Sequence, residues 1–117
     1  MDVVAWQQRL RVFAQDRDWE QFHTPKNLAM ALSVEASELL EIFQWLSAEQ
    51  SAAVLQSPAA SNVRDEVADV LLYLLRLADV LDLDLEACLE HKIAENAARY
   101  PAEDVRGSAA KAGPVLG

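Results

Sequence analysis

The sequence contains few of the residues that mark several common classes of protein. One cysteine and three glycines among 117 residues exclude an internal disulfide and leave no glycine-rich phosphate-binding loop. No apolar run approaches the roughly 18 residues that a membrane span requires. With 10 basic against 19 acidic residues, the formal net charge of −9 disfavours nucleic acid and anionic lipid as partners. These features predict a cytoplasmic protein that contacts neither nucleic acid nor membranes.

The residues that are abundant predict one all-α domain. Hydrophobic residues make up 52% of the chain, which is enough for one core, and they recur at helical spacing. We expect a four-helix bundle over residues 1–106 and a disordered tail over residues 107–117, which are rich in glycine, alanine, serine and proline. The expected long helices run from Asp2 to Asp16, from Pro25 to Trp45 or Leu46, from Asn62 to Leu81, and from just after Asp82 or Asp84 to the residue before Pro101, with a short helical turn from Ser47 to Leu55.

Helix start signals support these boundaries. Asp2 and Thr24 stand where an N-cap side chain accepts a backbone hydrogen bond. Ser47 begins a capping-box pattern, and we expect Ser61 or Asn62 to cap the third long helix.

Two pairs of acidic residues lie one helical turn apart on the second and third long helices. Glu35 and Glu38 form the first pair, and Glu66 and Asp69 form the second. Glu35 falls within the apolar stripe of its helix, where a carboxylate requires a partner. An antiparallel return of the chain would bring both pairs to one level of a bundle. Because four converging carboxylates stay ionised together only around bound cations, we predict a metal site made of these residues.

The donor set predicts the metal and the class of substrate. All-oxygen ligation favours Mg²⁺, with Mn²⁺ as the second candidate. A di-iron bundle needs Glu-x-x-His on two helices, and His91 has no glutamate three residues before it, so that motif is not present twice. Mg²⁺ completes its shell with water and phosphate oxygens, so a nucleoside polyphosphate is the expected substrate. Lys92, Asn96 and Arg99 follow one face of the fourth helix, and Lys92 and Arg99 would neutralise phosphate charge.

Aromatic and apolar surfaces predict further contacts. The segment between the first two helices keeps Trp19 and His23, which a solvated linker rarely does. Trp19 and Trp45 could stack on a base, or they could pack in the core. The third long helix is apolar most of the way round, so we expect part of it to line an interface between copies of the chain.

These residues resemble the all-α nucleotide pyrophosphohydrolases of the MazG-like superfamily, whose signature is Glu-x-x-Glu followed downstream by Glu-x-x-Asp. The resemblance is stronger to the dCTP pyrophosphatase branch and extends from about Leu10 to Pro101. The more specific motifs are Arg17-Asp18-Trp19-Glu20-Gln21-Phe22-His23, Phe43-Gln44-Trp45 and Arg99-Tyr100-Pro101.

The resemblance implies an activity and a set of site residues. The implied reaction is hydrolysis of a deoxynucleoside triphosphate, dCTP or a modified dCTP, to the monophosphate and pyrophosphate, which cleanses the nucleotide pool. It implies Mg²⁺ on Glu35, Glu38, Glu66 and Asp69, and a dimer or a dimer of dimers with sites between subunits. The residues that it places near the substrate are Trp19, His23, Lys26, Asn27, Trp45, Tyr73, Lys92, Asn96, Arg99 and Tyr100.

Departures from the family pattern leave alternatives open. Some relatives carry an acid beside the first metal-binding glutamate, where this chain has Val34 and Ala36. The base that activates water is then Glu41, Glu38 or a metal-bound hydroxide. Another base preference, such as dUTP or damaged purine triphosphates, is the nearest rival activity. A non-catalytic dimeric helical module that binds nucleotides is the rival from another class.

Overall fold

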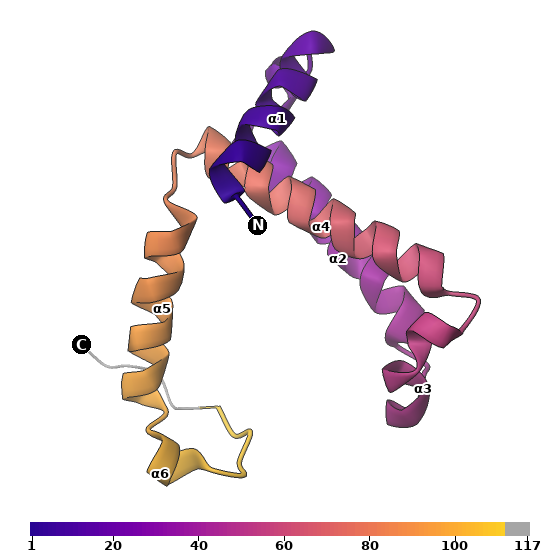
Figure 1. Cartoon of the computed structure of the whole chain (residues 1–117), viewed down its shortest axis with the longest axis vertical. Helices are drawn as coiled ribbons and strands as arrows, with labels where there is room; N and C mark the ends of the chain where they lie inside the picture. Colours follow the sequence, from indigo (N-terminus) through magenta and orange to yellow (C-terminus); the bar gives the residue numbers. More distant parts are fainter. Residues whose placement is uncertain (112–117) are drawn as a thin grey trace. The chain divides into compact units, whose positions relative to one another are not determined.

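The computed structural model describes residues 1–111, and every regular element in this range is a helix, which confirms the predicted all-α class. The chain divides into two compact units, residues 1–82 and 83–117, and each is described by itself. The expected single domain over residues 1–106 stays a prediction. The elements are α1 (Val3–Asp16), η1 (Glu20–Phe22), α2 (Pro25–Phe43), α3 (Ala48–Ala52), η2 (Val54–Gln56), α4 (Ala60–Val80), α5 (Leu85–Arg99) and α6 (Ala102–Val105) (Figure 1).

The first unit is built on the pairing of α2 with α4. The two helices lie side by side and run in opposite directions, and α1 packs against α4 (Figure 1). Leu28 of α2, Ala14 of α1, and Leu75 and Ala78 of α4 are each at most 3% exposed. These small and branched apolar side chains allow close approach of the helices, and their burial stabilises the unit.

The helix boundaries of the first unit follow the predicted signals, except at the end of α2 and at the start of α4. Asp2 and Thr24 cap α1 and α2 by accepting backbone N–H groups, and Ser47 forms the predicted capping box. The second long helix ends at Phe43, earlier than predicted.

The predicted cap of α4 was wrong. This helix begins at Ala60, and neither Ser61 nor Asn62 lies at its N-cap position. The Ser57 hydroxyl accepts the N–H of Ala59 at 3.2 Å, and this turn at Pro58 begins the helix before those residues. Ser61 and Asn62 therefore fall inside its first turn.

The second unit contains α5 and α6. Asp84 caps α5 by accepting the N–H of Ala87, which places the fourth long helix within its predicted limits. The short helix α6 was not predicted. Of the predicted tail, residues 107–111 are exposed and contain no helix, and residues 112–117 lie outside the described part. No helix within residues 1–111 has the length and apolar character needed to cross a bilayer.

Candidate active site

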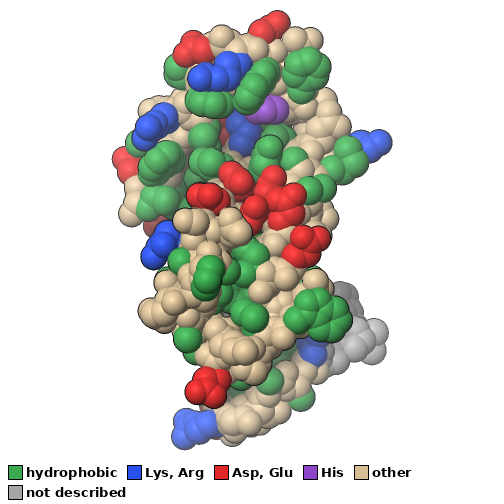
Figure 2. Space-filling model, turned by 90° about the vertical axis from the view of Figure 1, so that its right-hand side faces the viewer, with side chains coloured by type: hydrophobic (Ala, Val, Ile, Leu, Met, Phe, Trp, Pro, Cys, Tyr) green, Lys and Arg blue, Asp and Glu red, His purple; other side chains and the backbone are tan. Residues whose placement is uncertain are grey.

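Three of the four predicted metal ligands meet between α2 and α4. One carboxylate oxygen each from Glu35, Glu38 and Glu66 lies within 4.8 Å of the others. Figure 2 shows acidic side chains gathered in one group on this face, with apolar side chains around them. The antiparallel pairing of α2 with α4 therefore brings the two Glu-x-x-acid segments together as the sequence predicted.

The electrostatics of this cluster favour a bound cation. One oxygen of Glu35 and one of Glu66 are buried and have no hydrogen-bond partner in the described chain. The pKa of Glu35 is raised above its ordinary value, first by the adjacent Glu66 carboxyl and then by burial. The pKa of Glu38 is raised chiefly by Glu35. Unpartnered carboxylate oxygens that disfavour one another's ionisation fit the oxygen-rich shell of a hard divalent cation.

The fourth predicted ligand, Asp69, lies next to this group. It does not belong to the set of three converging oxygens, but its charge contributes to the raised pKa of Glu35. The Asp69 side chain also lines a cavity of about 160 Å³ in the first unit. Asp69 thus connects the acidic cluster with a second, mostly apolar part of the surface.

The cavity contains three of the residues expected to bind substrate. Trp19, His23 and Tyr73 line it together with Asp69, and the other lining residues are Leu10, Phe13, Leu72 and Arg76. The ring of Trp19 meets Phe13 edge-on at 5.8 Å and His23 at 6.4 Å, measured between ring centroids. Small-molecule sites typically enclose roughly 300–1,000 Å³, so this cavity has room for a planar base rather than a whole nucleotide.

Local hydrogen bonds hold the aromatic segment beside the helices. The Trp19 N–H donates to the carbonyl of Ala14 at 2.9 Å after Asp18 adopts a left-handed φ of 54°. The Asn27 side chain, on the first turn of α2, donates to the carbonyl of Phe22 at 3.0 Å. Asn27, expected to contact substrate, therefore fastens the loop that carries the aromatic residues.

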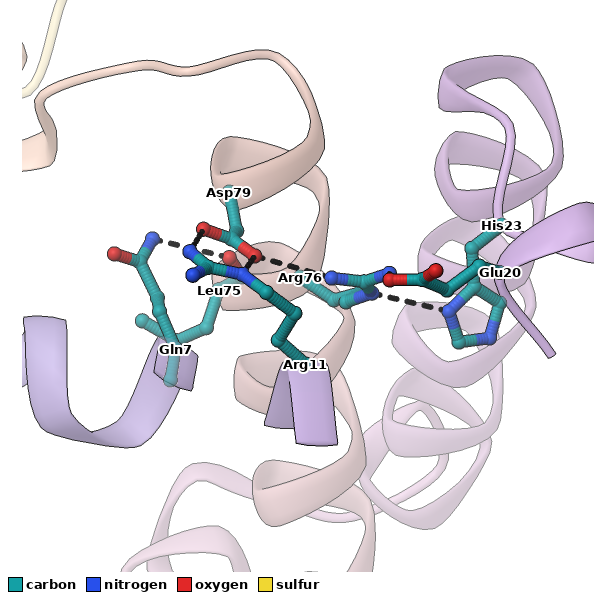
Figure 3. Close-up of polar contacts among 7 residues, drawn as sticks. All are labelled: Gln7, Arg11, Glu20, His23, Leu75, Arg76 and Asp79. Atoms are coloured by element: carbon teal, nitrogen blue, oxygen red, sulfur yellow. Dashed lines mark hydrogen bonds and ion pairs between the residues drawn. The ribbon is translucent and has the colours of Figure 1, made fainter. Parts of the chain in front are cut away.

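Arg76 of α4, which lines the cavity, is the buried centre of a polar network (Figure 3). Its side chain is 8% exposed, and its guanidinium lies 3.0 Å from Asp79 and 3.8 Å from Glu20. Its Nε donates to Nδ1 of His23 at 3.1 Å. Arg11 of α1 donates from Nε to the same Asp79 oxygen at 3.1 Å, so one carboxylate holds two arginines.

The residues expected to meet phosphates lie together in the second unit. A hollow of about 720 Å³ is lined by Lys92, Asn96, Arg99 and Tyr100, and by three further residues, Ile93, Ala97 and Lys111. Lys92 pairs with Glu95 at 3.3 Å on the same helix, and the Arg99 guanidinium lies 5.6 Å from the Tyr100 ring centre. The i, i+4 spacing along α5 therefore gathers these polar groups on one face.

Three predicted site residues lie outside the cavity and outside the set of converging oxygens, although the charge of Glu41 contributes to the raised pKa of Glu38. Lys26 and Glu41 are exposed on α2, and Trp45, just beyond the end of α2, is 86% exposed. None of the three lines the cavity. Their roles in binding or catalysis stay predictions.

Sequence reasoning missed Arg76 and Phe13 as lining residues. Phe13 follows Leu10 by three residues, at the spacing of an apolar stripe on the first helix, and this spacing fits a core residue as well as a cavity-facing aromatic. Arg76 follows Glu66, Asp69 and Tyr73 at spacings of three, four and three, which places all four on one face of α4. That register was a usable signal for Arg76.

Comparisons with known proteins show which family the chain is similar to. The chain matches the MazG-like family over residues 30–114. It is 45% identical to dCTP pyrophosphatase 1 of Rattus norvegicus over 100 residues, which cover 85% of this chain and 59% of that protein. The human dCTP pyrophosphatase 1 is 42% identical over the same shares. The chain thus spans 59% of the length of these curated relatives.

A solved structure is also similar to this chain. A pyrophosphatase from Archaeoglobus fulgidus superposes with a TM-score of 0.75 and 43% sequence identity, covering 80% of this chain and 87% of that one. This chain belongs to the MazG-like family.

Proposed function

We propose that the protein hydrolyses dCTP, or a modified dCTP, to the nucleoside monophosphate and pyrophosphate. The observation that carries the proposal is the position of Asp69, which lines the aromatic cavity and acts electrostatically on Glu35 of the acidic cluster. A base in the cavity would then direct its phosphates towards the carboxylates. The names of the relatives, dCTP pyrophosphatase 1, support this choice of substrate.

Glu35, Glu38, Glu66 and Asp69 would hold Mg²⁺, with Mn²⁺ as the second candidate. When bound there, the cation supplies charge neutralisation on phosphate oxygens and lowers the pKa of water. The buried, unpartnered oxygens of Glu35 and Glu66 support this assignment, because a burial cost of that kind is offset by a cation. The four carboxylates would hold the cation and balance its charge.

The remaining site residues divide between the base and the phosphates. Trp19 and Tyr73 would contact the base and sugar from the walls of the cavity, with His23 as a hydrogen-bonding group. In the second unit, Lys92, Asn96, Arg99 and Tyr100 would meet phosphate oxygens, for which a cationic hollow is suited. Lys26 and Trp45 stay candidates for contacts at the rim of the site.

The test is product analysis with purified protein, dCTP and Mg²⁺. We expect dCMP and pyrophosphate in equal amounts. A Glu35→Gln, Glu66→Gln variant should lose activity by a factor of more than about a hundred, the scale of removing a central electrostatic group. Glu49→Gln, an exposed change on α3, is the matched control. Formation of dCDP and phosphate, or no turnover with a panel of dCTP, dUTP and purine triphosphates, would overturn the proposal.

Glu38 and Glu41 are the candidate catalytic bases, and they can be separated. Glu38 belongs to the converging oxygens, whereas Glu41 is exposed one helical turn further along α2. If Glu41 takes the proton from water, Glu41→Gln lowers kcat and leaves the thermal stabilisation by Mg²⁺ unchanged. Glu38→Gln should lower both. A Glu41→Gln protein with full kcat would assign the base elsewhere.

We also propose that copies of the chain associate in the cytoplasm as a dimer or a dimer of dimers. Val67, Leu71 and Leu74 of α4 are between 39% and 50% exposed, and Leu40 of α2 is 60% exposed. Apolar side chains in this number on one pair of helices favour burial against another copy. Sedimentation that shows only monomers at micromolar concentration would contradict this part of the proposal.

A further inference from the structure

A buried arginine sets the hydrogen-bonding state of His23. The Arg76 Nε donates to His23 Nδ1 at 3.1 Å (Figure 3). A guanidinium has donors and no acceptor, and it does not lose its proton in proteins. The ring nitrogen that faces it must therefore carry a lone pair, so the imidazole is neutral with its proton on Nε2.

The surroundings of His23 keep this form at neutral pH. Burial, followed by the positive charge of Arg76, lowers the pKa of His23, and Glu20 opposes them more weakly. Asp79 fixes the guanidinium from the other side and is itself held by Arg11. Within the described residues, Nε2 of His23 makes no hydrogen bond, while the side chain lines the cavity. The free N–H is thus available to a ligand in the cavity.

We propose that Arg76 is a positioning residue that fixes His23 as a donor at Nε2, so that the cavity selects bases that present an acceptor there. This inference rests on the proposed function. Cytosine offers an unprotonated ring N3 beside its O2, two adjacent acceptors. Uracil and thymine keep acceptors at O2 and O4 but carry a proton on N3, so at N3 they would oppose the His23 N–H with a second donor. A fixed donor that meets the base at N3 therefore favours cytosine.

The tautomer is tested directly by NMR on protein labelled with ¹⁵N-histidine. At pH 7 we expect His23 to show a protonated Nε2 and an unprotonated Nδ1, and His91, whose side chain is 81% exposed and whose Nε2 lies 3.6 Å from Glu95, serves as the solvent-exposed reference. In Arg76→Met, which keeps an unbranched apolar stem without the guanidinium donors, the proton should redistribute between the two nitrogens. A charged His23, a proton on Nδ1, or an unchanged tautomer in Arg76→Met would overturn the proposal.

The selection is tested by the ratio of kcat/KM for dCTP and dUTP. We expect this ratio to fall about tenfold in Arg76→Met, the scale of one lost oriented hydrogen bond. Arg11→Met is the matched control, because it also removes an Asp79 partner and leaves the contact between Arg76 and His23 in place. An unchanged ratio in folded Arg76→Met, or an equal fall in Arg11→Met, would refute a positioning role.

Two further variants serve if Arg76→Met does not fold. The amide nitrogen of glutamine can occupy the position of Nε2, whereas that of asparagine can occupy only the position of Nδ1. His23→Gln should therefore keep more of the dCTP preference than His23→Asn, and equal loss would contradict a donor at Nε2. Because the NMR measurement needs no turnover, failure of the tautomer and failure of the proposed activity are distinguishable.

Discussion

Replacing Asp79 by asparagine should destabilise the first unit more than any surface charge change. The Asp79 side chain is 11% exposed, and its buried partner Arg76 is 8% exposed. Removing one member of a buried ion pair costs about 3–5 kcal/mol. The second partner, Arg11, is 46% exposed, and such half-exposed pairs contribute only about 0.2–1 kcal/mol. Because asparagine keeps one acceptor, we expect a loss of about 3 kcal/mol in the free energy of unfolding.

The assay is urea unfolding at a fixed protein concentration, since association changes apparent stability. The expected loss corresponds to about 12–24 °C in Tm for a unit of this size. Arg11→Ala should cost about 0.5 kcal/mol, and Asp65→Asn, an exposed change on α4, serves as control. A change below 0.5 kcal/mol in Asp79→Asn would refute the view that this pair stabilises the fold.

The pH dependence of the same variant tests the mechanism. Arg11, and with it Arg76, lowers the pKa of Asp79 below its ordinary value. The ionised carboxylate is thus favoured in the native state, so its contribution is complete above the unfolded pKa of about 3.9. The contribution is lost as the pH falls through the lower native pKa. The difference between the native protein and Asp79→Asn should therefore be constant from pH 7 to pH 5 and shrink in stronger acid.

Three further results are expected. Mg²⁺ should raise the Tm of the native protein more than that of Glu35→Gln, Glu66→Gln, as measured by scanning calorimetry, and equal shifts would contradict the metal site. The raised pKa values of Glu35 and Glu38 make protons compete with the cation, so the affinity for Mg²⁺ should weaken as the pH falls from 7. Titration calorimetry in buffers of different ionisation heat should detect the protons that Mg²⁺ releases on binding. An affinity independent of pH would argue against these ligands. Leu28→Ala, at a side chain 1% exposed, should cost about 2–5 kcal/mol in urea unfolding, and a loss below 1 kcal/mol would place the core elsewhere.

The helices and the acidic pairs could be predicted because their causes are local. Caps at Asp2, Thr24 and Ser47 each act within three residues, and helical periodicity decides which carboxylates share a face. The start of α4 could not be predicted in the same way. It depends on a turn at Pro58 that competes with the capping preference of the residues after it.

The contacts of the cavity depend on tertiary packing and were only partly accessible. The sequence predicted that the segment with Trp19 and His23 contacts a ligand. It could not predict the hydrogen bond between His23 and Arg76, because these residues are 53 positions apart. Asn27 was expected to contact substrate, but its side chain holds the loop by a hydrogen bond to Phe22, and no local sequence pattern predicted that bond. Helical periodicity predicts which residues share a face of a helix, whereas only the packed structure shows which residues of other elements they contact.

The face of α4 that carries Glu66, Asp69, Tyr73 and Arg76 gives the site a fixed length. At about 1.5 Å of rise per residue, the ten steps from Glu66 to Arg76 span roughly 15 Å. A compound with the right heterocycle but a shortened phosphate chain would reach one end of this span and leave the other empty. Inserting a single residue between Asp69 and Tyr73 would turn the acids by about 100° from the aromatic wall. Such an insertion should uncouple recognition from hydrolysis even if every site side chain is kept.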